Sequence, residues 1–405
     1  MHAESTTNGQ PTKGQTVSRK VAIVGVALSD CGRVDDATPY ALHAQAARRA
    51  LADSGLGREV VDGFASAGLG TLAPAEVAEY LGLRPTWVDS TSVGGSTWEV
   101  MAAHAADAIA AGHANAVLLV YGSTARADVK AGRRTGNLSF GARGPLQFEV
   151  PYGHTLIAKY AMAARRHMHQ YGTTIEQLAS VAVQARANAA LNPEAMFRTP
   201  ITVDEVLDGP MIADPFTKLH CCLRSDGGAA VLLVAEEYVR DCRTRPVWIL
   251  GTGEHVSHVS MSEWADFTVS PAAVSGRIAF ERAGVRPQEM DFAEIYDAFT
   301  YMTLVTLEDL GFCGKGEGGE FVDAAKGRLR VEGGEFPVNT DGGGLSAQHP
   351  GMRGLFLLVE AVRQLRGDGG ARQVRTAAGG LPELGVASGT GGWFCSSGTV
   401  VLGRG

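Results

Sequence analysis

The sequence contains no run of 18 apolar residues, and its first 20 residues, MHAESTTNGQPTKGQTVSRK, lack the apolar segment of a secretory signal. A membrane-spanning helix needs about 20 mostly apolar residues. We therefore predict a cytoplasmic protein without a membrane span. The polar opening is expected to form a disordered tail over residues 1–19.

The sequence also lacks an excess of positive charge. Its formal net charge is −7 at pH 7, from 36 Lys and Arg against 43 Asp and Glu. Binding to nucleic acid draws most of its affinity from Lys and Arg contacts to phosphates, and a broad positive field is absent here. Nucleic acid is therefore not expected as a partner.

Cysteine is scarce and unpatterned. The six cysteines, at positions 31, 221, 222, 242, 313 and 395, include no C-x-x-C pair. This pattern is typical of reduced thiols packed in a core. The run His220-Cys221-Cys222 cannot easily wrap one tetrahedral ion with three adjacent residues, so no metal site is predicted.

Alternating strand and helix patterns predict α/β layering. The 405 residues exceed the usual length of one domain. The strand pattern at 247–256 resembles the one at 21–29, which favours two similar halves, 20–245 with a loop insertion at about 124–215, and 246–405. We expect strands over residues 21–29, 62–70, 229–237, 247–256 and 292–299, helices over 38–53, 75–81, 156–171, 175–191, 271–283 and 351–366, and closing strands within 385–403.

A helix following Gly94-Gly95 is rich in alanine and has little polar surface apart from Glu99, His104 and Asp107. A helix that is apolar on nearly all sides is expected to be buried. The phrases VDSTSVGGST at 88 and VNTDGGGLSA at 338 echo each other before two such helices. Two related halves would bring both helix N-termini to one interface. Ser92 stands at the first of them, either presented to a pocket or serving, with its neighbours, as an N-cap.

The stretch NTDGGGLSAQHPGMRG, residues 339–354, is the strongest candidate site. Gly343 and Gly344 let the backbone approach a bound group closely, and His349 precedes an apolar helix. Unpaired N–H groups at a helix start favour an oxyanion, and an imidazole there can add a hydrogen bond. Enolate or acyl chemistry fits this pattern, and a Gly-rich turn with a surface histidine fits it equally.

The stretch from Thr124 to Leu156 reads as a long irregular loop. Long loops inside a compact domain are usually functional. Its basic residues could hold the phosphates of a nucleotide-like carrier, although a solvated lid explains them as well. The basic residues are Arg126, Lys130, Arg133, Arg134 and Arg143.

Taken together, these segments resemble the thiolase superfamily, in particular the sterol-carrier-protein-x thiolases and the bacterial lipid-transfer-protein aldolases. The resemblance covers residues from about 20 to 404 and rests on four segments: 167–193, 198–231, EIYDAF at 294–299, and the His349 segment. It implies a five-layer αβαβα fold of two similar halves, a homodimer or larger assembly, and acyl-coenzyme A substrates. Coenzyme A would be part of the substrate, with no covalently bound cofactor.

Residue by residue, the resemblance departs from active thiolases at both cysteines. The nucleophilic Cys of thiolases matches Ser92, and a serine is not ionised without a paired base. The second Cys falls at about Gly391 or Gly392, which leaves Cys395 as a packed strand cysteine rather than an acid/base. The histidine of the family's HP pair matches His349.

At EIYDAF the resemblance points to the aldolases, because Tyr296 stands where thiolases carry Asn or His. Retro-aldol cleavage of a β-hydroxyacyl thioester needs a base for the hydroxyl proton and donors for the enolate. Tyr296 is predicted as the base and His349 as a donor, with Asp297, Ser346 or a water as other proton acceptors. A buried core tyrosine is the simpler alternative.

The resulting hypothesis is a carbon–carbon lyase that cleaves a β-hydroxyacyl-coenzyme A, with a sterol side chain as the expected acyl group. By the resemblance, a small partner with a zinc ribbon and an OB-fold would assist it. Two alternatives stay open: an acyltransferase that uses Ser92 or another group in place of the cysteine, and a non-catalytic thiolase-like subunit that binds acyl chains or supports a partner enzyme.

Overall fold

The computed structural model describes residues 19–70, 72–133, 144–153 and 155–405. Within them a mixed sheet runs in the order β3-β2-β4-β7-β1-β8-β11-β10-β9. Its strands are β1 (Val21–Leu28), β2 (Gly63–Ala65), β3 (Trp87–Asp89), β4 (Ala116–Ser123), β7 (Gly227–Ala235), β8 (Val247–Val256), β9 (Phe292–Ile295), β10 (Leu384–Gly391) and β11 (Ser396–Arg404). The short strands β5 (Met211–Ala213) and β6 (Phe216–Thr217) pair separately.

Helices cover the sheet and fill its centre. Those described are α1 (Pro39–Ser54), α2 (Ala73–Tyr80), α3 (Thr97–Ala110), α4 (Ala125–Lys130), α5 (Leu156–Tyr171), α6 (Ile175–Ala190), α7 (Val203–Leu207), α8 (Ala272–Ala283), α9 (Thr300–Asp309), α10 (Gly318–Phe321), α11 (Gly343–Ser346) and α12 (Gly354–Arg366).

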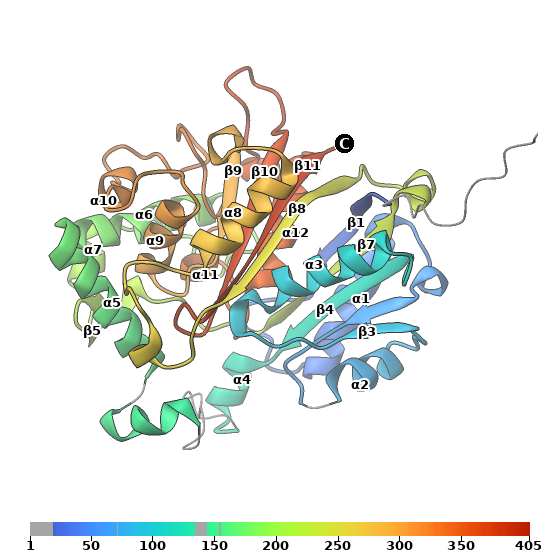
Figure 1. The fold of residues 1–405 in the computed structure, drawn as a ribbon, viewed down its shortest axis with the longest axis horizontal. Helices are drawn as coiled ribbons and strands as arrows, with labels where there is room; N and C mark the ends of the chain where they lie inside the picture. Colours follow the sequence, from blue (N-terminus) through green and yellow to red (C-terminus); the bar gives the residue numbers. More distant parts are fainter. Residues whose placement is uncertain (1–18, 71, 134–143, 154) are drawn as a thin grey trace, which may run out of the picture.

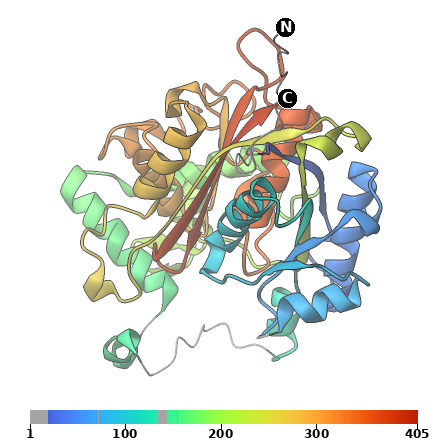
Figure 2. The ribbon, with the colours of Figure 1, turned by 45° about the vertical axis from the view of Figure 1, so that its right-hand side comes forward.

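The predicted five layers are present. Helix α1 packs on β1, β4 and β7, and α8 packs on β8 and β11, so each outer helix covers a different half of the sheet. Helices α3 and α12 contact each other and strands of both halves. Figures 1 and 2 show the two strand groups diverging around these central helices. The order of layers is therefore helix, sheet, helix, sheet, helix.

Local sequence explains the central layer. Alanines on α3 keep its surface small enough to pack on strands from both halves, and its side chains from Thr97 to Ala103 are all buried. Helix α12 buries the run LFLLVEAV. The two helix starts meet closely, since a Cβ on Gly354 would lie 2.6 Å from the Gly95 carbonyl oxygen. The prediction that two helix N-termini converge is confirmed.

Several predicted boundaries need correction. The segment predicted as a strand over 292–299 forms β9 only as far as Ile295, and its last residues pair with another segment instead: the Cys222 N–H donates to the Ala298 carbonyl at 2.8 Å, and Phe299 forms an isolated bridge with Cys221. The helix predicted from 351 begins at Gly354. The stretch predicted as irregular from Thr124 contains α4 and two 3-10 turns, η3 (Pro145–Phe148) and η4 (Val150–Tyr152).

The proposed division of the chain at 245 and 246 remains a prediction; it falls between β7 and β8, which lie on opposite sides of β1. Of the proposed loop insertion at 124–215, helices α5 to α7 lie on the side of α9 and α10, beside the C-terminal half (Figure 1). The predicted tail over 1–19 lies outside the described residues except for Arg19. Its guanidinium donates 2.8 Å to the Asn115 side chain.

Candidate active site

A cavity of about 1000 Å³ opens where the two halves meet. Three of the predicted catalytic residues line it: Ser92 from the turn before α3, Tyr296 directly after β9, and His349 from the loop between α11 and α12. The remaining wall is mixed, with apolar residues such as Leu156, Met302 and Met352, and polar residues that include His258 and Thr390. The fold therefore brings together Ser92 and His349, which lie more than 250 positions apart in the sequence.

Backbone contacts fix Tyr296 at the cavity wall. Its N–H donates to the Ser388 carbonyl of β10 at 3.0 Å, continuing the β9–β10 pairing by one residue. The preceding Ile295 N–H donates 2.7 Å to the Asn339 side chain. Behind the ring lies Gly95, where a Cβ would stand 2.4 Å from two tyrosine ring carbons. Only glycine at that turn leaves room for this orientation of Tyr296.

The Tyr296 hydroxyl and the His349 imidazole form a pair. Oη lies 3.1 Å from Nε2, and the rings meet edge to face at 89°. Burial raises the pKa of Tyr296 well above its usual value and lowers the pKa of His349 to about 4. At neutral pH both are uncharged, so the phenol can donate its proton to an imidazole nitrogen that accepts it.

The His349 loop is held from one side by residues 223–225. The His349 N–H donates 2.9 Å to the Ser225 side chain, and the Ser225 N–H donates to the His349 carbonyl at 3.3 Å. Just beyond, the Tyr121 hydroxyl donates 2.7 Å to the Pro350 carbonyl. These contacts explain why the 198–231 segment, prominent in the sequence, belongs to the site: it orients the histidine.

Asp297, Gly343 and Gly344 are not among the residues that line the cavity. The Asp297 carboxylate instead accepts the Gly344 N–H at 2.7 Å and the Leu345 N–H at 3.2 Å. Gly343 has φ 70°, and a Cβ there would lie 1.9 Å from an Asp297 oxygen. The glycine turn is thus shaped around the carboxylate, and all three residues stand behind His349.

Ser92 is exposed at the cavity, whereas the predicted positions of the second thiolase cysteine cannot hold one. A Cβ on Gly391 would lie 1.8 Å from the Val93 carbonyl oxygen. At Gly392, φ is 60° and a Cβ would lie 2.7 Å from the Cys395 sulfur. Cys395 does line the cavity, and burial raises the pKa of its thiol to about 11, so it is protonated at neutral pH.

The predicted phosphate-binding arginines are dispersed. Arg133 lines the cavity and pairs with Asp128 at 2.9 Å. Arg126 is absent from the cavity wall and pairs with Asp35 at 2.6 Å and with the buried Asp226 at 3.0 Å. Arg134 lies outside the described residues. Of the three arginines predicted to bind phosphate, Arg133 is the one that lies at the cavity within the described part of the chain.

Two features behind the wall were not predicted as site residues. Glu99, in the first turn of α3, buries a carboxyl group whose oxygens have no hydrogen-bond partner among the described residues. Arg353 is fully buried beside the glycine turn. A glutamate in an alanine-rich helix was visible in the sequence, but no local pattern distinguishes Arg353 from a surface arginine at a helix start.

The arrangement suits proton transfer within an apolar cavity. A phenol paired with a neutral imidazole can take a proton from a bound hydroxyl and pass its own proton onward. Gly94 and Gly95 lie at the start of the 3-10 turn η2 (Gly94–Ser96) and of α3, where backbone N–H groups lack helical acceptors. The backbone N–H groups of this turn can therefore stabilise a negative oxygen in the cavity.

Within the described ranges, no cluster of three or more His, Cys, Asp or Glu side chains is arranged to hold a metal ion. The helices of that same part of the chain do not combine the length and apolar character that a membrane crossing requires.

Comparison with known proteins gives consistent relatives. Residues 253–404 match the thiolase C-terminal domain-like family. An acetyl-CoA acetyltransferase of Methanothermobacter thermautotrophicus is 33% identical over 92% of this chain and 97% of its own length. A 17-hydroxy-3-oxo-4-pregnene-20-carboxyl-CoA lyase of Mycobacterium tuberculosis is 33% identical over 92% of this chain and 100% of its own. A solved structure, Ltp2-ChsH2(DUF35) aldolase, superposes with a TM-score of 0.85 at 29% identity and covers 96% of this chain and 99% of that chain.

Proposed function

Because this chain belongs to the thiolase superfamily, we propose that it is a carbon–carbon lyase that cleaves a β-hydroxyacyl-coenzyme A by a retro-aldol reaction. The observation that carries the proposal is the 3.1 Å contact between the Tyr296 hydroxyl and His349 Nε2 in a cavity without a cysteine nucleophile at position 92. The names of two relatives, a lyase and an aldolase, agree with it.

The proton of the β-hydroxyl leaves first. Tyr296 accepts it while passing its own proton to His349, which avoids a free phenolate that burial makes unfavourable. The oxygen left on the substrate becomes a ketone carbonyl as the bond between the α and β carbons breaks. The electron pair of that bond forms the enolate of the thioester, and the proton held on His349 finally returns to the α carbon. Atoms and charge balance, and no free coenzyme A is consumed.

The thioester oxygen carries the negative charge of the enolate. We place it against the backbone N–H groups at Gly94 and Gly95, where the positive end of α3 adds to their effect. Tyr296 thus has the role of base in the proposal, and the helix start supplies the oxyanion donors in place of His349. His349 Nε2 can then accept the Tyr296 proton without also having to donate a hydrogen bond to the enolate oxygen.

The cavity volume suits a bulky acyl group, since pockets for drug-sized ligands span about 300–1,000 Å³. We propose a sterol side chain as that group, in line with the steroid-related name of one relative. Arg133 is the candidate for contact with the coenzyme A phosphates. The products are then a ketone and a short acyl-coenzyme A.

The proposed assembly is a cytoplasmic homodimer with a small partner that carries a zinc ribbon and an OB-fold. One related structure names a second component, ChsH2(DUF35), in its title, which supports a partner of this kind. The partner would help to bind the thioester, while the Tyr296–His349 pair belongs to this chain.

Product analysis tests the proposed function. The purified protein, with and without the partner, is given a tertiary β-hydroxyacyl-coenzyme A in the absence of free coenzyme A, and products are identified by mass spectrometry. A ketone with acetyl- or propionyl-coenzyme A is the expected result. If both preparations leave the substrate intact yet shorten a β-ketoacyl-coenzyme A when coenzyme A is added, the protein is a thiolase and the proposal is wrong.

The acyltransferase alternative is favoured by one relative's name and by the exposure of Ser92 in the cavity. We expect Ser92→Ala to keep lyase kcat within about threefold of the wild-type value, because a serine without a paired base is a weak nucleophile and the proposed route forms no acyl-enzyme. Steady-state kinetics measure this, and Thr91→Ala, one residue earlier, serves as the matched control. A loss of activity confined to Ser92→Ala would favour the acyltransferase.

A further inference from the structure

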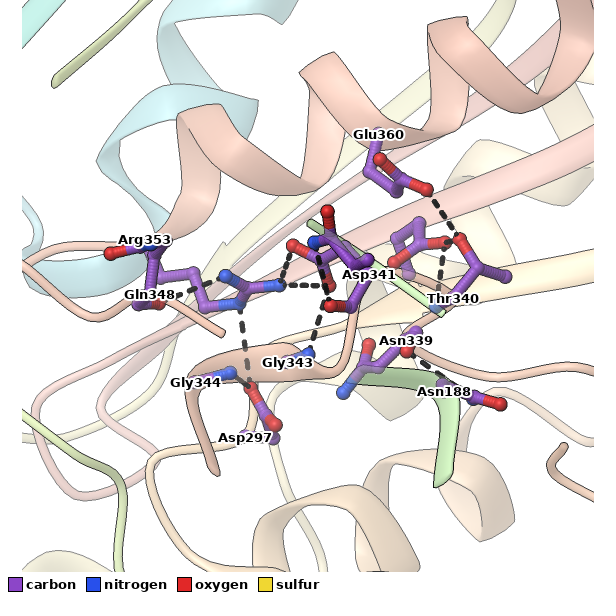
Figure 3. Close-up of polar contacts among 12 residues, drawn as sticks. Asn188, Asp297, Asn339, Thr340, Asp341, Gly343, Gly344, Gln348, Arg353 and Glu360 are labelled. Atoms are coloured by element: carbon purple, nitrogen blue, oxygen red, sulfur yellow. Dashed lines mark hydrogen bonds and ion pairs between the residues drawn. The ribbon is translucent and has the colours of Figure 1, made fainter. Parts of the chain in front are cut away.

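Arg353 is a fully buried arginine that stands immediately before α12, four residues after His349. It does not line the cavity. Its Nη2 donates to both oxygens of Asp341, at 2.6 and 2.8 Å, and its Nη1 donates 2.9 Å to the Gln348 carbonyl. Nε lies 3.5 Å from an oxygen of Asp297. Figure 3 shows the guanidinium directed at these three groups from one side chain.

Two of these contacts lead directly to the reacting pair. Asp297 is bonded through the chain to Tyr296, and Gln348 precedes His349. The Asp341 carboxylate also accepts the Gly343 N–H at 2.8 Å, so the same oxygen that binds the arginine begins the glycine turn. We infer that Arg353 is a positioning residue that fixes the Tyr296–His349 geometry from behind, an inference that rests on the proposed function.

The shape of the guanidinium explains why arginine occupies this position. Its planar group carries three nitrogens, and each faces a different partner: Nη2 binds both oxygens of Asp341, Nη1 donates to the Gln348 carbonyl, and Nε faces Asp297. A lysine would keep the charge and lose the fork. Removing one partner from a buried ion pair leaves the other charge unpaired, which is costly. The contacts of Arg353 therefore fix the positions of Asp341, Gln348 and Asp297. Through Gln348 and Asp297 they also fix the neighbouring His349 and Tyr296.

The charge of Arg353 also reaches the pair. Burial is the main reason that the pKa of His349 is low, and the neighbouring Arg353 and Arg224 lower it further. Tyr296 is the uncharged neighbour at 3.1 Å. Loss of the Arg353 cation should therefore let His349 titrate at a higher pH, an effect that a purely structural arginine elsewhere would not produce.

The test compares Arg353→Met and Arg353→Lys with Arg372→Met. Arg372 is also a buried arginine; it binds Glu360 through two 2.9 Å hydrogen bonds and contacts neither Tyr296 nor His349 in those bonds. It is the matched control for the loss of a buried ion pair. Kinetics of lyase activity are measured at equal folded fraction, and the His349 imidazole is titrated by NMR in histidine-labelled protein, assigned by its absence from His349→Gln.

We expect Arg353→Met to lower kcat by about 100-fold with KM within about threefold, as a misplacement of about 1 Å would. The His349 titration should move up by about one pH unit. Arg353→Lys should restore the titration without restoring kcat, and Arg372→Met should change neither. If Arg353→Met does not fold, the lysine variant alone decides between charge and geometry.

The inference is overturned if Arg353→Met and Arg372→Met share the same kcat and the same His349 titration. Failure of the proposed function is separate. Wild-type protein would then show no cleavage of the β-hydroxyacyl thioester, while the His349 titration would still report whether Arg353 acts on the imidazole.

Discussion

Tyr296→Phe is expected to lower lyase kcat by about 10³-fold while KM and the midpoint of thermal unfolding change little. General acid–base groups contribute roughly 10²–10⁴ to rates, and the phenol is the proposed first proton acceptor. Phenylalanine keeps the ring that packs on Gly95 and removes only the hydroxyl that contacts His349. The stability cost of that single hydrogen bond is about 1 kcal/mol.

Tyr301→Phe is the matched control for this prediction. Tyr301 is also fully buried, and its hydroxyl donates 3.0 Å to the Phe267 carbonyl, but it does not line the cavity. It should lose a similar amount of stability and keep its kcat. Equal rates for wild type and Tyr296→Phe, measured as ketone release under saturating substrate, would remove Tyr296 from the mechanism.

The parts of the site that sequence could predict are those marked by short motifs. Tyr296 in EIYDAF and His349 in the QHP segment are 53 positions apart, and resemblance to one family places them in one pocket. The five-layer fold was predictable for the same reason, supported by the buried character of the alanine-rich helix. Ser92 followed from the glycines after it, and the structure places it at the cavity.

The sequence could not show toward which side of a turn each side chain points. Asp297, Gly343 and Gly344 were predicted to meet the substrate, yet they contact each other, because the carboxylate fills the space that the missing side chain of Gly343 leaves. Arg126 sits among basic residues in the sequence and is neutralised by Asp35 and by the buried Asp226, which lies directly before β7, 100 positions away. Spacing along the chain does not report such pairings.

Glu99→Gln is expected to stabilise the protein at pH 8 and to remove part of its dependence on pH. The Glu99 carboxyl is buried without a hydrogen-bond partner among the described residues, in a space kept open by glycines: a Cβ on Gly389 would lie 2.1 Å from its Oε2. Burial raises the pKa of Glu99 from 4.5 to about 8. Between about pH 4.5 and pH 8, Glu99 therefore keeps its proton in the folded protein, whereas the unfolded chain has already released it.

The sign of the effect follows from linkage. Between those pH values Glu99 is protonated in the folded state and ionised in the unfolded state, so its contribution to the free energy of unfolding falls as the pH rises, by roughly 3–5 kcal/mol in total. Glutamine has no proton to lose, so the advantage of Glu99→Gln over wild type should grow across this window. Urea denaturation at intervals from pH 5 to pH 8.5 measures the difference, and parallel curves for the two proteins would contradict the prediction.

Glu360→Gln provides a control of opposite sign on the facing helix. Glu360 is buried like Glu99, but Arg372 holds its pKa at about 2, below the unfolded value of 4.5. Its contribution to stability is complete above about pH 5.5 and is lost only as the pH falls toward 2, so Glu360→Gln should destabilise by a constant amount across pH 5.5 to 8.

The two buried glutamates of the central layer therefore differ in charge. Glu360 is kept ionised by Arg372, whereas Glu99 is kept protonated because it is buried without a hydrogen-bond partner among the described residues. An uncharged Glu99 also keeps negative charge away from Tyr296, whose proton must leave for His349 rather than be held by a neighbouring carboxylate.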